Sequence, residues 1–292
     1  MKKILISGAN SYIGTSLDKY LAYWPNEYQV DTLDLIQAGW QNKSFIGYDC
    51  VFHVAGIAHI NTRKLTDNQR DQYWKVNADL PYEVAEKAKI EGVGQFIFLS
   101  SMSVYGEIGK AKTALVISKE TPLEPKDIYG ESKLHAEKKL SQLQDGRFSL
   151  VILRPPMIYG PGCKGNYPQL SRFARRFPVF PRIDNQRSML FIDNLCMFVK
   201  AIIDDVRNGV FLPQNREYVC VSNLVGLIAR EHNKRIILTR LFNPLLKPLI
   251  GRIGIITKLF GGIVYARFPQ TEDVNAKFVG LEESIRITEN MK

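Results

Sequence analysis

The chain has 292 residues, 45% of them hydrophobic, which is enough to bury a large core in one big domain or two unequal ones. Its 39 Lys and Arg residues outnumber 29 Asp and Glu, and the formal charge of +10 attracts phosphates, nucleic acids and anionic lipids alike. The four cysteines lack CxxC spacing, which argues against a disulfide framework and predicts no metal site. No apolar run reaches about 18 residues and no signal-peptide cleavage site follows the start, so we expect a cytoplasmic protein.

Apolar runs of strand length alternate with amphipathic stretches over the first 155 residues, a rhythm typical of a parallel sheet covered by helices. We expect strands at residues 3–7, 29–33, 50–55, 95–100 and 150–154, and helices at residues 13–23, 69–91 and 128–143. Too few residues separate Asp34 from Cys50 for a helix and a strand, so one repeat of the pattern is trimmed there.

Prolines and glycines follow Arg154, and the pattern becomes less regular beyond them. The sequence therefore predicts an α/β fold with a doubly wound, Rossmann-like parallel sheet in residues 1–160. A smaller C-terminal domain is expected over residues 161–292, with the chain returning to the first domain around residues 186–222.

A glycine-containing turn, GANSYIG, lies between the first strand and the first helix. Gly8 permits the tight turn, and Gly14 lets the helix pack on the sheet while its N-terminal amides face an anion. Ser11 is small enough for a pyrophosphate to approach. The turn predicts a dinucleotide site made of Gly8, Asn10, Ser11, Tyr12, Ile13 and Gly14, with a plain glycine-rich connector as the alternative.

Asp34 falls at the end of the second strand, about 20 residues after the last glycine of the turn, where a carboxylate can accept hydrogen bonds from a ribose diol. A carboxylate would repel the extra phosphate of NADP, so this position favours NAD. Asp31 is the other candidate for the ribose-binding carboxylate, but the alternation of side chains along a strand points it away from the site. The alternative interpretation is that both carboxylates lie on a solvated turn and bind no cofactor.

Tyr129 and Lys133, in the segment YGESK, are four residues apart and share one helical face. A nearby ammonium lowers the pKa of a phenol from about 10, which would make Tyr129 a base near neutral pH. Upstream, a predicted strand ends in the hydroxyls of SSMS, at the carboxyl edge where ligands of open sheets bind. A serine there can hydrogen-bond a substrate oxygen alongside the tyrosine.

Five segments in order, GANSYIG, VFHVAG, SSMSVYG, YGESK and LRPP, resemble the extended short-chain dehydrogenase/reductase superfamily, specifically its NAD-dependent nucleotide-sugar epimerase/dehydratase branch. The resemblance implies that Ser101 is the catalytic hydroxyl, that Tyr129 is the acid/base, and that Lys133 binds the nicotinamide ribose and tunes Tyr129. It also implies NAD contacts from Ala55, Gly56, Asn77, Tyr129, Lys133 and Pro156.

The resemblance also bears on the reaction class, through the two residues that follow Ser101. Sugar dehydratases of this branch carry an Asp-Glu pair directly after the catalytic hydroxyl, where this chain has Met102 and Ser103, so elimination of water is not expected. Hydride chemistry at C4 of the sugar is left, either in a 4-epimerase or in a 4-ketosugar reductase.

The overall pattern is similar to bacterial surface-polysaccharide enzymes, so we expect an epimerase of a UDP-hexose or UDP-N-acetylhexosamine. The implied substrate contacts are Ser101, Met102, Ser103, Tyr129, Asn166 and Arg187. A non-catalytic dinucleotide-binding sensor or scaffold is the alternative of another class, against which the intact triad argues. No basic helix or aromatic platform typical of nucleic-acid readers is recognisable, so no nucleic-acid partner is expected.

Residues 240–267 are rich in Leu and Ile, contain five cations and carry no acidic residue. Apolar positions 242, 246, 249, 253, 256, 260 and 263 recur at helical spacing, which fits helices facing the core or a surface helix on anionic lipid. Pro244, Pro248 and Gly251 interrupt such a helix and argue against a membrane span. The core is our first expectation, peripheral membrane contact is the second, and the resemblance implies a homodimer through the YGESK helix.

Overall fold

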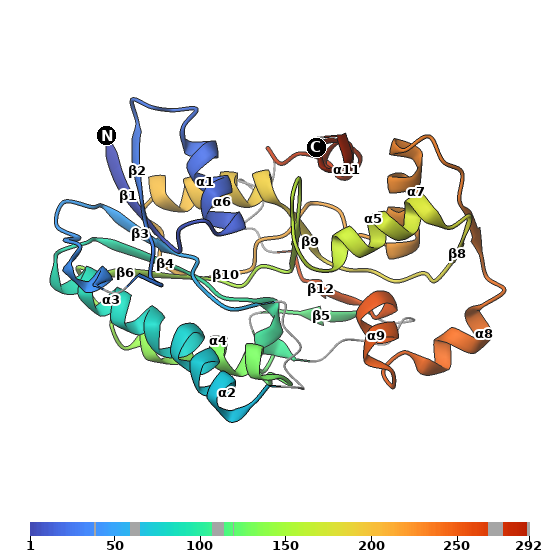
Figure 1. Cartoon of the computed structure of the whole chain (residues 1–292), viewed down its shortest axis with the longest axis horizontal. Coiled ribbons are helices and arrows are strands. Elements are labelled where there is room, and N and C mark those ends of the chain that lie inside the picture. Colours follow the sequence, from blue (N-terminus) through green and yellow to red (C-terminus); the bar gives the residue numbers. More distant parts are fainter. Residues whose placement is uncertain (38, 59–64, 107–113, 119, 268–276, 291–292) are drawn as a thin grey trace. The chain divides into compact units, whose positions relative to one another are not determined.

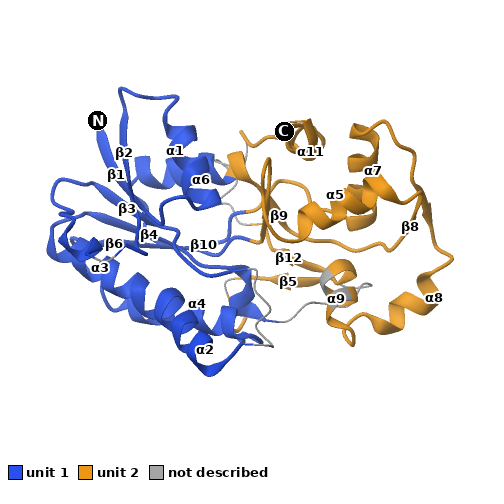
Figure 2. Ribbon diagram, in the orientation of Figure 1, with its two compact units in different colours: residues 1–106, 123–155, 195–213 blue, residues 107–122, 156–194, 214–292 orange. Residues whose placement is uncertain are grey.

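The computed structural model describes residues 1–37, 39–58, 65–106, 114–118, 120–267 and 277–290 (Figure 1). The chain divides into two compact units (Figure 2): unit 1 comprises residues 1–106, 123–155 and 195–213, and unit 2 comprises residues 107–122, 156–194 and 214–292. The division differs from the predicted boundary at residue 160 and from the predicted return at 186–222. Residues 107–122 also belong to unit 2, which the sequence did not indicate. They contain β5 (Leu115–Ile117), which pairs with the distant β12 (Ile263–Tyr265).

Unit 1 is a doubly wound α/β fold whose sheet has six parallel strands in the order β10-β6-β4-β3-β1-β2. The strands are β1 (Lys2–Ser7), β2 (Tyr28–Leu33), β3 (Cys50–His53), β4 (Gln95–Leu99), β6 (Ser149–Leu153) and β10 (Gly209–Phe211). The predicted fold class is confirmed, and each of the five predicted strands is found. The short β10 was not predicted, because it has only three residues.

The trimmed repeat after β2 is confirmed. Between β2 and β3, the described residues contain only a 3-10 helix, Trp40–Asn42, and no further strand pairs with β2. The buried rings of Trp40 and Phe45 from this connection pack into the core of unit 1. As a result β2 is an edge strand, and Asp34 follows it at the edge of the sheet.

Helices cover both faces of this sheet: α1 (Tyr12–Leu21) and α6 (Ile192–Asp204) lie on one side, α3 (Leu80–Ile90) and α4 (Ile128–Ser141) on the other (Figure 1). The helix predicted over 69–91 is α2 (Asp67–Trp74) and α3 joined by a π-helical turn, Lys75–Asp79. Pro81 has no N–H, so it cannot donate to the carbonyl four residues before it. Just before it, the N–H of Leu80 donates to the carbonyl of Lys75, five residues back, which is the hydrogen bond of a π-helix. This wider turn carries Asn77.

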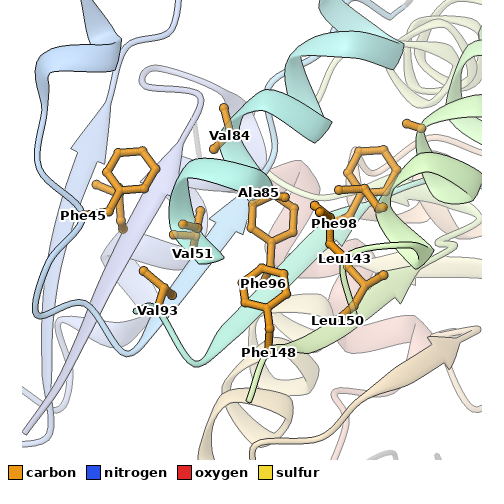
Figure 3. Close-up of a cluster of buried hydrophobic side chains, with 14 of the residues drawn as sticks. Phe45, Val51, Val84, Ala85, Val93, Phe96, Phe98, Leu143, Phe148 and Leu150 are labelled. Atoms are coloured by element: carbon orange, nitrogen blue, oxygen red, sulfur yellow. The ribbon is translucent and has the colours of Figure 1, made fainter. Parts of the chain in front are cut away.

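A buried apolar cluster holds the second helical layer on the sheet (Figure 3). Val51 of β3 and Phe96 of β4 pack with Ala85 of α3 and with Leu143, just beyond α4. Full burial of a side chain of this size stabilises the fold by roughly 1.5–3 kcal/mol. The cluster therefore fixes α4, the helix that carries Tyr129 and Lys133, against the ends of the strands.

Unit 2 contains short paired strands and helices. Its strand pairs are β7 (Met157–Tyr159) with β9 (Met189–Phe191), β8 (Val179–Pro181) with β11 (Ile237–Thr239), and β5 with β12. Helices α5 (Asn166–Arg176) and α11 (Leu281–Asn290) both pack against α7 (Val221–Glu231).

The segment from residue 240 to 267 is broken into α8 (Asn243–Leu246), a 3-10 helix (Lys247–Leu249) and α9 (Gly254–Phe260). As predicted, no single helix runs through this segment: a break between residues 249 and 254 includes Gly251, whereas Pro244 and Pro248 each lie at the start of a short helix. Ile263, which the helical spacing included, lies in β12 instead. In the part of the chain that the structure describes, no helix is long and apolar enough to cross a membrane.

Candidate active site

The glycine turn lies at the switch point of the sheet, between β2 on one side of β1 and β3 on the other. The amides of Gly8 and Ala9 donate to the carbonyl of Leu33 at 2.9 and 3.1 Å. Gly8 has a φ of +120°, and a Cβ there would lie 2.7 Å from the amide nitrogen of Ala55. A Cβ on Gly14 would lie 2.9 Å from Ile6 Cγ2. Both positions therefore require glycine, for the backbone angle and for close approach.

Ser11 has a structural role in this turn. It is the N-cap of α1, and its Oγ accepts a hydrogen bond from the amide of Gly14 at 3.1 Å. Asn10 before it adopts a left-handed φ of 62°, and Tyr12 and Ile13 follow it in the first turn of the helix. The first-turn amides of a helix form a natural binding site for an anion such as a pyrophosphate.

The two carboxylates near the end of β2 have different partners. Asp31 Oδ2 accepts a hydrogen bond from the hydroxyl of Tyr48 at 2.6 Å. Asp34 directly follows Leu33, whose carbonyl anchors the glycine turn, and its Oδ1 accepts from the amide of Ile36 at 2.9 Å. Asp34 is thus the carboxylate beside the turn, as strand alternation suggested, and its contact with a ribose stays a prediction.

Asn77 and Gly56 bring the loop after β3 close to Lys133. A Cβ on Gly56 would lie 3.1 Å from Asn77 Oδ1 and 3.5 Å from Lys133 Nζ. The buried Asn77 amide donates to the carbonyl of Ile57 at 2.9 Å and accepts from its N–H at 2.8 Å. Asn77 therefore holds the loop that carries Ala55 and Gly56, a role that the sequence did not specify.

The three predicted catalytic side chains converge at the carboxyl end of β4. Ser101 follows β4, and its Oγ lies 3.1 Å from both the amide and the hydroxyl of Ser103. Tyr129 stands in the first turn of α4, and its phenol lies close enough to Ser101 for the serine side chain to lower the phenol's pKa. One turn further along α4, Lys133 Nζ donates to the carbonyl of Leu99 at 2.9 Å. Met102 begins the 3-10 helix Met102–Tyr105 that follows Ser101.

Burial is the largest influence on the pKa of Tyr129 in this structure, and the predicted effect of Lys133 on that pKa stays a prediction. Burial raises the pKa of Tyr129, the side chain of Ser101 opposes that rise, and the charge of Asp127 adds to it. The Lys133 ammonium is bound to the Leu99 carbonyl, and burial lowers the pKa of Lys133 itself to about 8. Ser101 is therefore the neighbour that favours the phenolate here.

Gly130 explains how the start of α4 comes so close to the Ser101 turn. A Cβ at Gly130 would lie 2.5 Å from the carbonyl oxygen of Ser103, so a larger residue would push the helix away. Asp127 caps the helix by accepting from the amide of Gly130 at 2.9 Å. The segment YGESK contains this glycine, but its role could not be recognised from the sequence.

A buried ion pair beneath the site was not predicted. Arg154, at the end of β6, donates to Glu137 of α4, with Nη2 2.6 Å from Oε2 and Nε 3.1 Å from Oε1. Ser100 also donates to the Glu137 carboxylate, and Arg154 Nη1 donates to the hydroxyl of Tyr105 at 2.8 Å. Glu137 stands four residues after Lys133, so the sequence did indicate a third polar residue on this helical face.

Three predicted site residues belong to unit 2: Pro156, Asn166 and Arg187. Asn166 is exposed at the start of α5, and the backbone of Arg187 pairs with Val219 at 2.9 and 2.8 Å. Burial lowers the pKa of Arg187 to about 10. Their contacts with cofactor or substrate stay predictions. Over the residues that can be described, no three His, Cys, Asp or Glu side chains gather into a metal site.

Residues 4–220 match the NAD dependent epimerase/dehydratase family, and the chain belongs to this family. The UDP-glucose 4-epimerase of Vibrio cholerae is 31% identical over 249 residues, which cover 78% of this chain and 75% of that protein. The N-acetyl-alpha-D-glucosaminyl-diphospho-ditrans,octacis-undecaprenol 4-epimerase of Escherichia coli O157:H7 is 27% identical over 254 residues, covering 80% and 73%.

Among solved structures, the UDP-glucuronic acid 4-epimerase of Bacillus cereus in complex with NAD superposes with a TM-score of 0.74 at 18% identity, covering 99% of this chain and 96% of that one. The resemblance stated from the motifs is confirmed, and the chain is an enzyme of an NAD-dependent family. NAD is its cofactor, and unit 1 fits it: Gly8 and Gly14 place no side chain in the turn before a helix N-terminus, and Asp34 follows the strand whose end anchors that turn.

Proposed function

We propose that the chain is a 4-epimerase of a UDP-hexose or UDP-N-acetylhexosamine, working through a 4-keto sugar in surface polysaccharide biosynthesis. The observation that carries the proposal is the convergence of Ser101, Tyr129 and Lys133 at the carboxyl end of the sheet, in the unit that holds the glycine turn. The similarity to the Vibrio cholerae UDP-glucose 4-epimerase supports a nucleotide-sugar substrate.

The chain's own residues supply the proton chemistry in this proposal. When bound, NAD would supply the hydride chemistry at C4 of the sugar. Tyr129 takes the proton of the 4-hydroxyl, and the Ser101 hydroxyl stabilises the phenolate and holds the sugar oxygen in place. Lys133 donates to the ribose of the cofactor and balances the charge of the phenolate. Epimerisation then requires the keto sugar to present its other face before the hydride returns.

The turn after Ser101 argues against a dehydratase. Met102 carries no ionisable group, and the Ser103 hydroxyl is engaged by Ser101 at 3.1 Å. Elimination of water across C5 and C6 needs an acid and a base at the sugar, and this turn has no carboxylate to supply either. The alternative that shares the same triad is a 4-ketosugar reductase, which needs reduced cofactor from outside.

The test is to incubate the purified protein with UDP-glucose and UDP-N-acetylglucosamine, with and without NADH, and to follow the sugars by NMR. Conversion to the 4-epimer without added NADH supports the proposal. Stoichiometric consumption of NADH with a UDP-4-keto sugar, and no epimerisation, would replace it by a reductase. N-acetylglucosaminyl diphosphate on a polyprenol is a further substrate to offer, in view of the Escherichia coli relative.

Tyr129→Phe is the inactive variant for this assay, and Tyr23→Phe is its matched control. The Tyr23 side chain is 79% exposed and lies after α1, away from the β4 edge. We also propose that the enzyme acts in the cytoplasm as a homodimer. Light scattering after size-exclusion chromatography tests the dimer, and a monomeric mass would contradict it.

A further inference from the structure

The positive charge of the protein is concentrated in two segments of unit 2, residues 165–183 and 232–267, which we call the basic segments. Together they contain eleven Lys or Arg residues and no Asp or Glu. The other residues of the chain carry nearly equal numbers of cationic and anionic side chains, so the basic segments account for the net charge of +10. Such concentration attracts a polyanionic partner to this part of unit 2.

The basic segments form one continuous part of unit 2. Strand β8 from the first pairs with β11 from the second, with Val179 opposite Ile237. The amide of Arg182 donates to the carbonyl of Thr239 at 2.7 Å, and Asn243 Nδ2 donates to the carbonyl of Arg182 at 2.9 Å. The two segments are therefore neighbours in the fold where β8 meets β11, although they are far apart in sequence.

Large apolar side chains accompany these cations at the surface. Leu241 is 79% exposed, Leu245 is 71% exposed and Ile237 is 64% exposed. Of the fourteen large apolar side chains exposed in the described part of the chain, six belong to the basic segments: Phe177, Ile237, Leu241, Phe242, Leu245 and Ile253. The exposure is not a sign of a poorly packed region, because Phe180 and Phe260 of the same segments are buried, with ring centroids 5.7 Å apart.

We infer that the basic segments dock unit 2 on an anionic lipid surface. Lipid phosphates attract Lys247, Arg252 and the other cations, while the acyl boundary of a bilayer buries aliphatic side chains such as Leu241 and Leu245. A nucleic acid would satisfy the charge but would leave those aliphatic groups in water. Among the described residues of the basic segments, one exposed Lys or Arg side chain has an acidic partner. This is Arg240, whose Nη2 lies 3.2 Å from Oδ2 of Asp184.

The experiment uses the full chain and vesicles of equal parts phosphatidylglycerol and phosphatidylcholine, with pure phosphatidylcholine vesicles for comparison. We expect sedimentation with the anionic vesicles at low salt and at least about tenfold weaker partitioning to neutral ones. Leu241→Ser with Leu245→Ser should weaken partitioning to anionic vesicles about tenfold, since each substitution removes an inserting side chain. Lys247→Gln with Arg252→Gln should weaken it to a similar degree and reduce its dependence on salt.

The matched control is Ile46→Ser with Ile90→Ser, two side chains of unit 1 that are 74% and 78% exposed, and its partitioning should not change. Protein that stays in the supernatant with anionic vesicles would overturn the inference. Binding that responds to the charge variant but not to the leucine variant would also overturn it, as would tighter binding to single-stranded RNA than to vesicles. All variants should epimerise soluble UDP-sugars as the parent does, so that loss of docking and failure of the proposed activity are distinguishable.

Discussion

The buried pair of Glu137 and Arg154 allows a quantitative test of what holds the active site together. The side chain of Glu137 is 4% exposed and that of Arg154 is 10% exposed, so neither charge has water as an alternative partner. Glu137→Gln removes the negative charge and leaves the guanidinium buried without a counter-charge. Removing one partner of a buried pair costs about 3–5 kcal/mol, and because glutamine keeps one oxygen acceptor for Ser100 or Arg154 we expect about 3 kcal/mol.

Urea unfolding followed by circular dichroism measures this loss, and the slope with urea should be unchanged, since the same surface is exposed on unfolding. Glu131→Gln is the control, because Glu131 is exposed on the same helix and should change stability by less than about 0.5 kcal/mol. The double variant Glu137→Leu with Arg154→Met removes both charges and should recover part of the loss. Equal stabilities for Glu137→Gln and Glu131→Gln would refute the argument that charge pairing holds these elements.

Four further predictions concern the site itself. Tyr129→Phe should lower turnover at least about 100-fold while NAD binding, measured by calorimetry, is retained; near-normal turnover would exclude Tyr129 as the base. Ser11→Gly should cost only a few tenths of a kcal/mol and leave NAD affinity intact, because glycine is an acceptable N-cap. Gly8→Ala should reduce NAD affinity more than tenfold in the same titration, because alanine is strained at a φ of +120° and meets Ala55; equal affinities for both variants would contradict this account of the turn. Burial lowers the pKa of Lys133 from 10.5 to about 8 in the folded protein, so the unfolded chain binds more protons than the folded one between these pH values. The free energy of unfolding of the parent, relative to that of Lys133→Met, should therefore rise as the pH increases from about 8 to 10.5. Urea unfolding measures this difference, and a fall over that range would contradict the burial of this ammonium.

Much of unit 1 could be predicted from the sequence because the relevant patterns are local. In the strand Gln95–Leu99, residues 96–99 form an unbroken apolar run, and its burial on both faces follows from the neighbouring helices. Tyr129 and Lys133 share a face because the helical repeat places residues four apart together, whatever else surrounds them. The glycine turn is equally local, since the conformational freedom of Gly8 depends on the residue itself.

Partners that lie far apart in sequence were decided only by the tertiary structure. The pairing of Glu137 with Arg154 depends on where α4 crosses the end of β6, and the pairing of β5 with β12 moved the boundaries of the two units. Burial raises the pKa of Tyr129, and the extent of burial depends on everything packed around the phenol, which the spacing from Lys133 does not reveal.

Residues 240–267 make the same distinction clear. Their composition is a property of the sequence, and so is the absence of one long helix, which the structure confirms. The sequence allowed the apolar residues to face either the core or the surface. The structure buries Phe260 and leaves Leu241 and Leu245 in water, because burial of a side chain requires a packed neighbour, and only the folded chain determines which side chains have one.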